Sequence, residues 1–213
     1  MWETIKHTIL SPEWYIQMGG LYLLLLVIFA ETGLFVGFFL PGDSLLFVAG
    51  IYAEELAHEF FNVHFSIVML VIALAGILGN LVGYWFGKKS GPFLYSRNDT
   101  FFFKKRHLKS AQEFYEKNGA FTIVAARFVP IVRTFVPIVA GIVTMDYRKF
   151  TVYNIVGSVA WVFSMMLAGY FLSRQFPWIK DRLEIIVIGI ILITTLPVIF
   201  KFILGNKKGE VSE

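Results

Sequence analysis

The chain has 213 residues, of which 57% are hydrophobic and only 16% are charged, and its formal net charge is +4. Soluble domains average about 45–50% apolar and about 25% charged residues, so this composition excludes an ordinary soluble domain and predicts an integral membrane protein. The lack of cysteine excludes disulfides, zinc–thiolate sites and a thiol nucleophile, and the small net charge gives no reason to expect a nucleic-acid partner.

The first long apolar segment, residues 15–53, is too long for one helix and is interrupted by Pro41 and Gly42. Proline removes a backbone donor and clashes with the preceding turn, and inside lipid the freed carbonyl groups must find partners in protein or water. The segment also carries two acids deep in its apolar sequence, Glu31 and Asp43. We therefore expect a broken, re-entrant helical hairpin here rather than a plain span.

Residues 65–86 contain no charged side chain and predict a transmembrane helix, since a span needs about 20 apolar residues at about 1.5 Å each. Within and just past this segment, glycines recur at spacings of three and four, which permits close packing of helices in lipid. These glycines are Gly76, Gly79, Gly83, Gly87 and Gly91. Asn80 is a polar side chain in the middle of the span, and we expect it to hydrogen-bond a hairpin or a neighbouring helix.

The loop after this span, residues 88–119, is rich in lysine and arginine and is therefore expected in the cytoplasm. Residues 54–64, at the other end of the span, hold glutamates but no lysine or arginine, which suits the outside. Inside the basic loop, residues 101–118 mix aromatic residues with lysines. They predict an amphipathic helix on the cytoplasmic leaflet, with a solvated connector as the equal alternative.

The second broken segment, residues 120–141, carries Arg127 and Arg133, with Pro130 between them and Pro137 just after them. Loop charges counted back from the C-terminal lysines put both ends of this segment in the cytoplasm. That count favours a second re-entrant hairpin over the alternative, a proline-kinked span. A break at Pro130 would also let both arginines face one cavity, which a straight helix would not allow.

Two further segments, residues 151–172 and 185–200, are free of charge and predict spans, the second extending to residue 204 past Lys201. Each half of the chain then has a proline-broken segment ending in Ala-Gly, a short charged loop and a clean span. The two loops face opposite sides, as in the inverted repeats of many secondary transporters.

The expected fold class is an all-α polytopic membrane protein, an inverted repeat with two re-entrant helical hairpins plus three or more transmembrane helices. It forms a single membrane domain over residues 1–213. Its parts are a first repeat at 15–87, the basic cytoplasmic loop at 88–119, a second repeat at 120–172 and a C-terminal span at 185–204.

The four charges of the broken segments would cost roughly 10–14 kcal/mol near the bilayer centre if they were unpaired. Arginine suits phosphate because its guanidinium offers two parallel donors and stays ionised, so Arg127 and Arg133 are the expected anion-binding residues. Burial and a neighbouring arginine act in opposite senses on a carboxyl's proton affinity, so Glu31 and Asp43 are expected to balance charge and to exchange a proton. The alternative is two buried ion pairs that only lock the hairpins together.

An enzyme is not supported by this sequence. All four histidines lie outside the broken segments, and no Ser/His/Asp set or phosphate-binding loop can be assembled. We therefore expect no catalytic residues, no metal site and no cofactor.

The sequence resembles the DedA family of bacterial membrane proteins, which shares its core with eukaryotic VTT-domain scramblases. The resemblance covers about residues 25–165 and departs from the family pattern at Asn80, where the family often has Asp. The matching residues are Glu31, Pro41-Gly42-Asp43-Ser44, Ala49-Gly50, Gly76, Gly79, Gly83-Tyr84, Gly87, Gly91, Arg127-Phe128, Pro130, Arg133, Pro137, Ala140-Gly141, Phe150, Asn154, Gly157 and Trp161.

The resemblance implies two facing re-entrant hairpins and embedded charged residues that activity needs. It also implies a role in returning undecaprenyl phosphate across the inner membrane, with links to proton-motive force and envelope integrity. The expected function is therefore a multi-pass inner-membrane flippase for a polyprenyl phosphate, coupled to protons. Its expected partners are that lipid or a phospholipid and the bilayer, and a homodimer is compatible with this reading. The alternatives are a proton-coupled carrier of small solutes or drugs, and a structural protein that organises the membrane.

Overall fold

The computed structural model describes the chain in five parts, residues 12–34, 42–59, 61–96, 121–183 and 189. In these parts every regular element is a helix, and no strand is present. The helices are α2 (Pro12–Gly33), α3 (Gly42–Ile51), α4 (Ala53–Glu59), α5 (Phe65–Ser96), α7 (Phe121–Ala126), α8 (Pro130–Ile142), α9 (Tyr147–Gln175) and the 3-10 helix η2 (Pro177–Arg182).

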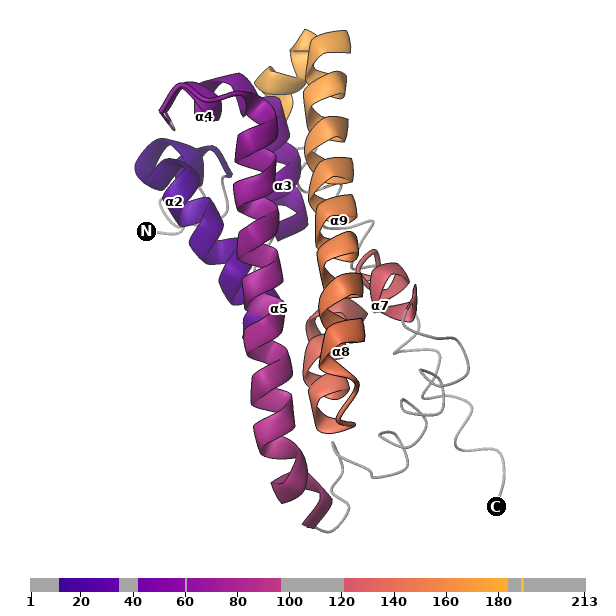
Figure 1. Ribbon diagram of the computed structural model, residues 1–213. Coiled ribbons are helices and arrows are strands. Elements are labelled where there is room, and N and C mark those ends of the chain that lie inside the picture. The colour runs from indigo at the N-terminus through magenta and orange to yellow at the C-terminus, as the bar shows by residue number, and fades with distance from the viewer. Residues whose placement is uncertain (1–11, 35–41, 60, 97–120, 184–188, 190–213) are drawn as a thin grey trace, which may run out of the picture.

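Two long helices, α5 and α9, run side by side and in opposite directions through the whole length of the molecule (Figure 1). Each contains an apolar stretch of 29 residues, long enough to cross a membrane. Their outward faces carry exposed leucine, isoleucine, valine and phenylalanine, which lipid would cover more favourably than water. The helices predicted at residues 65–86 and 151–172 are thus confirmed as long apolar helices.

The first broken segment consists of α2 and α3, which contact each other and are separated by residues 34–41 (Figure 1). A break near Pro41 and Gly42 is therefore confirmed, although Pro41 itself lies outside the described residues. All ten residues of α3 are buried, because α3 packs between α2 and α9.

Helix α2 contains a second irregularity that the sequence analysis did not predict. Gly20 has φ 49° and ψ −142°, so two helical stretches meet there at a kink. Glycine adopts positive φ without the steric cost that a Cβ would add, which explains the residue at this bend.

The second broken segment consists of α7 and α8, which are separated by Arg127, Phe128 and Val129. Val129 has an extended backbone (φ −110°, ψ 107°), and Pro130 then begins α8. A proline suits the first position of a helix because its missing N–H has no intrahelical acceptor there, and it forces the preceding residue out of the helical region. The predicted break at Pro130 is confirmed.

The expectation that Pro137 also breaks this segment is wrong. Pro137 lies inside α8, which continues without interruption to Ile142. A Cβ placed on Gly83 of α5 would lie 3.3 Å from the Cβ of Pro137, so the proline ring packs against a glycine of the neighbouring helix. This packing supports the helix across the backbone hydrogen bond that proline cannot make.

Backbone-to-backbone contacts at glycines join each broken segment to one long helix. A Cβ on Gly87 of α5 would overlap the Ile138 carbonyl of α8, and one on Gly141 of α8 would overlap the Tyr84 carbonyl of α5. Likewise, a Cβ on Gly50 of α3 would overlap the Met166 carbonyl of α9, and one on Gly169 would overlap the Phe47 carbonyl. The close packing predicted for the glycines of residues 65–91 is confirmed, and α3 and α9 repeat it.

Helix α4 and the C-terminal end of α9 lie at the same end of the molecule (Figure 1). There Arg174 donates to the Glu54 carboxylate at 2.8 Å, and both side chains are largely exposed. Arg174 was a cation that counted against placing this end outside, and here it is paired with an acid of the same end. The amphipathic helix predicted at 101–118 and the span predicted at 185–200 lie outside the described residues.

The loop charges together with this arrangement predict which end of α9 faces the cytoplasm. A cysteine introduced at Glu55, which is exposed in α4, should react with a membrane-impermeant maleimide added to intact cells. A cysteine at Lys149, exposed at the start of α9, should react only after the cells are permeabilised. The chain has no native cysteine, so there is no background labelling. Labelling of the Lys149 variant in intact cells would overturn the predicted orientation.

Candidate functional site

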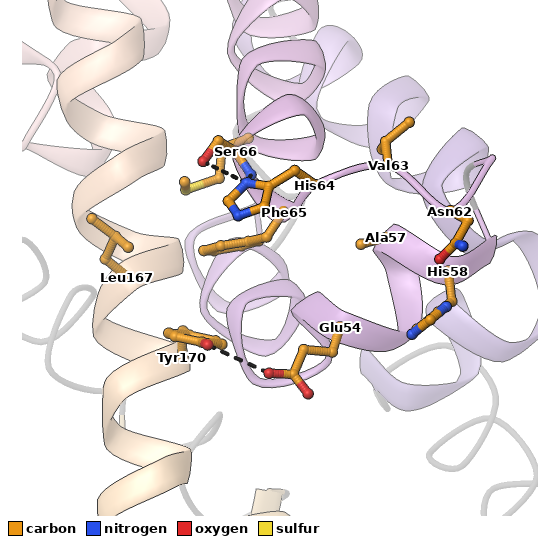
Figure 2. Close-up of a pocket in the computed structure, with 11 residues that line it drawn as sticks. Glu54, Ala57, His58, Asn62, Val63, His64, Phe65, Ser66, Leu167 and Tyr170 are labelled. Carbon is orange, nitrogen blue, oxygen red and sulfur yellow. Dashed lines mark hydrogen bonds between the residues drawn. The ribbon is translucent and has the colours of Figure 1, made fainter.

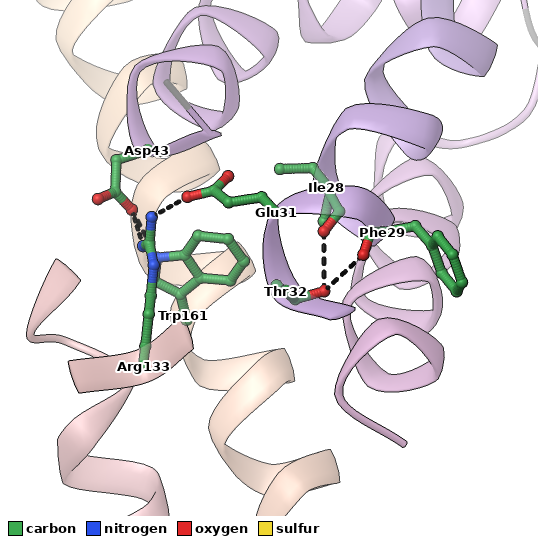
Figure 3. Close-up of polar contacts among 7 residues, drawn as sticks. All are labelled: Ile28, Phe29, Glu31, Thr32, Asp43, Arg133 and Trp161. Carbon is green, nitrogen blue, oxygen red and sulfur yellow. Dashed lines mark hydrogen bonds and ion pairs between the residues drawn. The ribbon is translucent and has the colours of Figure 1, made fainter. Parts of the chain in front are cut away.

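Four buried charged side chains meet where the two broken segments approach each other (Figure 3). They are Glu31 at the end of α2, Asp43 in the first turn of α3, Arg127 at the break before α8 and Arg133 in α8. Their exposed fractions are 1%, 8%, 4% and 8%, respectively. We call these four residues the charged cluster.

Arg133 binds both acids of the charged cluster. Its Nη1 donates to Asp43 Oδ1 and its Nη2 donates to Glu31 Oε1 (Figure 3). One guanidinium thus links the second broken segment to both helices of the first. A buried carboxylate is stable in apolar surroundings only when it is paired and hydrogen-bonded, and here one cation serves two carboxylates.

Local sequence explains why two acids can lie this close to one guanidinium. Gly42 has no side chain, and a Cβ there would overlap the Glu31 carboxylate, so glycine makes room for that acid at the start of α3. Asp43 lies in the first turn of α3, where the free N–H groups and the helix dipole favour negative charge. Both acids therefore lie at the positive end of a buried helix.

Trp161 of α9 forms the wall of the charged cluster and is 1% exposed. Its Nε1–H donates to Asp43 Oδ1 at 2.9 Å. Its ring lies 4.7 Å from the Arg133 guanidinium carbon and 5.6 Å from that of Arg127, measured to the ring centroid. Trp161 therefore positions Asp43 and offers its π face to both cations.

Arg127 has a different environment, because no carboxylate of the described residues lies within salt-bridge distance of it. Its Nη1 donates to Asn154 Oδ1 at 3.2 Å. Gly76 and Gly157 allow α5 and α9 to approach it, since a Cβ on either would lie 3.3 Å or 3.2 Å from the arginine side chain. Arg127 is therefore a buried cation held by neutral groups.

Asn80 of α5 lies beside Arg127 and Asn154, and its amide has two orientations that exchange oxygen and nitrogen. In one, Nδ2 donates to Asn154 Oδ1 at 2.7 Å. In the other, the nitrogen donates to the Thr32 carbonyl at 3.1 Å and the oxygen accepts from Arg127 Nη2 at 3.0 Å. The expectation that Asn80 hydrogen-bonds a neighbouring helix is confirmed.

Three buried polar atoms of the charged cluster have no hydrogen-bond partner: Arg127 Nε, Arg133 Nε and Glu31 Oε2. Buried donors and acceptors normally have partners, so each unpartnered atom marks a place for a ligand, a water or a proton. The two Nε–H groups can donate to an anion, and the Glu31 oxygen can accept from a proton donor. The site can therefore hold an anion and a proton at neighbouring positions.

The sequence analysis named all four charged residues, and the structure brings them together. It treated the two arginines as equivalent, whereas the structure gives both acids to Arg133 and neutral amides to Arg127. It gave no role to Trp161 or Asn154 beyond membership of a family pattern. A lone asparagine in an apolar span was the signal that singled out Asn80, and the same signal was present at Asn154.

A second, open cavity of about 480 Å³ lies at the far end of the molecule between α4, α5 and α9 (Figure 2). His64 Nδ1 accepts from the Ser66 backbone N–H at 3.3 Å, and the Tyr170 hydroxyl donates to Glu54 at 3.4 Å. Its histidines and Glu54 are exposed, so it lacks the buried charge of the first site. Among the described residues no group of three or more His, Asp or Glu is arranged to hold a metal ion.

Comparison with known proteins gives a consistent result along most of the chain. Residues 40–171 match the VTT domain family. The chain is 45% identical over 181 residues to protein DedA of Escherichia coli K12, which covers 85% of this chain and 81% of that protein. It is 37% identical to an uncharacterized membrane protein of Mycobacterium tuberculosis H37Rv (91% and 86% covered) and 28% identical to inner membrane protein YqjA of Escherichia coli K12 (84% and 79% covered). No solved structure matches the chain.

The unequal pairing of the two arginines predicts unequal effects on stability. Arg133→Ala leaves two buried carboxylates unpaired and should destabilise the protein by about 3–5 kcal/mol, the usual cost of removing one partner of a buried pair. Arg127→Ala removes a cation held by neutral amides and should cost clearly less. Thermal unfolding in detergent measures both, with Arg174→Ala as the control, because its pair with Glu54 is exposed and contributes at most about 1 kcal/mol. Equal losses for Arg127→Ala and Arg133→Ala would contradict the pairing described above.

Proposed function

This chain belongs to the DedA family of membrane proteins, and we propose that it transports a phosphate-bearing lipid across the bilayer. The observation that carries the proposal is the pair of buried guanidinium groups that face one indole, each with an unpartnered Nε–H. Arginine is suited to phosphate because it stays ionised and donates several hydrogen bonds in a fixed geometry. The cargo we propose is a polyprenyl phosphate. The resemblance noted above implies undecaprenyl phosphate and a role in cell-envelope synthesis.

The location of the site supports a lipid cargo over a water-soluble one. The charged cluster lies between apolar helices whose outward faces also carry exposed hydrophobic side chains. In our proposal the phosphate enters the charged cluster while the hydrocarbon chain stays in the bilayer. We also propose a multi-pass protein of the inner membrane, which the printed name of one relative, inner membrane protein YqjA, supports.

We further propose that α2–α3 and α7–α8 are re-entrant hairpins of an inverted repeat. Two glycine contacts support this: Gly50 with Gly169 joins α3 to α9, and Gly87 with Gly141 joins α8 to α5 in the same way. Each broken segment thus contacts the long helix of the other half. Such an arrangement would place the site between two related halves, as in many secondary transporters.

Proton coupling would follow from the pairing of Arg133. A phosphate that takes donors from Arg133 would leave Glu31 or Asp43 without its cation, and a buried carboxylate without a cation takes up a proton. The unpartnered Glu31 Oε2 already offers a site for that proton. Loading the lipid would then bind a proton, and releasing the lipid would release it. We propose no enzymatic step and no cofactor.

Two alternatives make different demands on the same residues. A carrier of small solutes or cationic drugs would use Glu31 and Asp43 to bind cargo, yet both acids are occupied by Arg133. A structural protein that organises the membrane would need only folding, so charge-neutral variants that fold should complement a deletion strain fully. The phosphate-lipid proposal predicts that such variants fail.

Transport of a polyprenyl phosphate in reconstituted vesicles tests the proposal directly. Arg127→Ala should lower the rate by at least about tenfold, because it removes a cation that meets the charge of the cargo. Arg174→Ala, which removes an exposed cation far from the charged cluster, serves as the control and should keep the wild-type rate. An Arg127→Ala protein that transports the lipid as fast as the wild type would refute the proposal.

The proposed coupling also predicts a dependence on pH. If lipid loading takes up a proton at Glu31 or Asp43, affinity for the phosphate lipid should be higher at mildly acidic than at mildly alkaline pH. The double variant Glu31→Gln with Asp43→Asn should show a flatter dependence, measured by binding titrations between about pH 6 and pH 8.5 with the same lipid. A double variant that keeps the full wild-type dependence would place the proton elsewhere, for example on the lipid phosphate itself.

A further inference from the structure

Asn80 is the nearest side chain of α5 to the cation that has no carboxylate. It is 1% exposed, and its amide reaches Arg127 Nη2 at 3.0 Å, the Thr32 carbonyl at 3.1 Å and Asn154 at 2.7 Å. On the other side, Asn154 is fully buried and also donates to the Ile77 carbonyl at 3.1 Å. Two carboxamides, one from α5 and one from α9, thus enclose the Arg127 guanidinium.

The formal charges divide the site into two unlike halves. Arg133 with Glu31 and Asp43 carries a net charge of −1 when all three are ionised. Arg127 with its two neutral amides carries +1. An anion entering the site therefore meets one cation already engaged by two carboxylates and one cation with no competing anion. Electrostatic complementarity directs the anion to Arg127.

We infer that Asn80 is a specificity-determining residue, which keeps Arg127 available to a phosphate by presenting a neutral amide where a carboxylate would fit. The inference rests on the proposed function and adds a residue to it. Aspartate has nearly the same shape as asparagine, so the difference at this position is charge alone. An ionised carboxylate at 3.0 Å from Nη2 would form a charge-assisted pair with Arg127 and would compete with the phosphate for it.

The amide has a second advantage over a carboxylate. Its two orientations differ by exchange of a donor and an acceptor, and both find partners in the surrounding helices. When a phosphate occupies Arg127, Asn80 can turn its N–H toward the phosphate oxygen, whereas a carboxylate has only acceptors and would repel it. Asn80 therefore accommodates both the empty and the occupied site.

The test uses the full-length protein in detergent and titrates it with farnesyl phosphate and, as the uncharged control, farnesol. Asn80→Asp should bind farnesyl phosphate at least about tenfold more weakly than the wild type at pH 8, because like charges then face each other across Arg127. As pH falls and the new carboxyl takes up a proton, the ratio between wild type and variant should shrink to about threefold or less. Asn80→Ala adds no charge and should change affinity by a similar small factor at every pH. Farnesol binding should not distinguish the three proteins.

A double-mutant cycle adds a readout that a purely structural role would not move: in an Arg127→Ala background, Asn80→Asp should have no further effect on farnesyl phosphate binding. If Asn80→Asp elutes as an aggregate, Asn154→Asp replaces it, because Asn154 Oδ1 contacts the same guanidinium at 3.2 Å and the same result is expected.

The possible results separate the two claims. A wild-type protein that binds farnesyl phosphate no better than farnesol overturns the proposed function and this inference with it. A wild-type protein that prefers farnesyl phosphate, with an Asn80→Asp variant that matches it at pH 8, overturns the inference alone. An Asn80→Ala variant as weak as Asn80→Asp, or an undiminished effect of Asn80→Asp without Arg127, would also overturn it.

Discussion

The guanidinium of Arg133 binds Glu31 and Asp43 at the same time, and the meeting of the two broken segments depends on this contact. Neither acid can stay ionised in apolar surroundings without a cation, and the cation cannot stay there alone. The contact needs α2, α3 and α8 to end or begin at one place. Gly42 provides the space for Glu31, the first turn of α3 favours the charge of Asp43, and Trp161 holds Asp43 with its indole N–H. Irregular backbone inside a membrane is tolerated only where such partners exist.

The two arginines of one short segment have opposite roles in this arrangement. Arg133 is satisfied by the protein itself, so it stabilises the fold and can change only if a carboxylate is neutralised. Arg127 lies between Asn80 and Asn154, and its charge has no counterpart among the described side chains. A site with one engaged and one available cation can receive an anion and respond to it in the same place. Family membership gives the class of protein, whereas this inequality gives the chemistry that we assign to it.

Sequence reasoning predicted the features that have a large energetic cost. Prolines in apolar segments and unpaired charges in lipid are expensive, so the two breaks and the grouping of Glu31, Asp43, Arg127 and Arg133 could be inferred from residue type alone. The partner of each arginine could not be inferred, because it depends on where helices begin and on the glycines that set their spacing. Pro137 was misjudged for a related reason: its ring packs on Gly83, so a neighbouring helix supports α8 where the local sequence predicts a break. The kink at Gly20 involves only a glycine's backbone freedom and no charge, and it was missed.

The backbone contacts at glycines also restrict how the molecule can move. Because Gly50 and Gly169 bring α3 and α9 into direct contact, and Gly87 and Gly141 do the same for α8 and α5, the helices of each pair cannot slide past each other without a steric clash. The natural moving parts are therefore two rigid bodies, α3 with α9 and α5 with α8, rather than the two broken segments. The bonds from Arg133 to Asp43 and from Trp161 to Asp43 then differ in kind, since the first crosses between the bodies and the second lies within one of them. A rocking motion of one body on the other would break the arginine contact, keep the indole contact, and open the site without unfolding either hairpin.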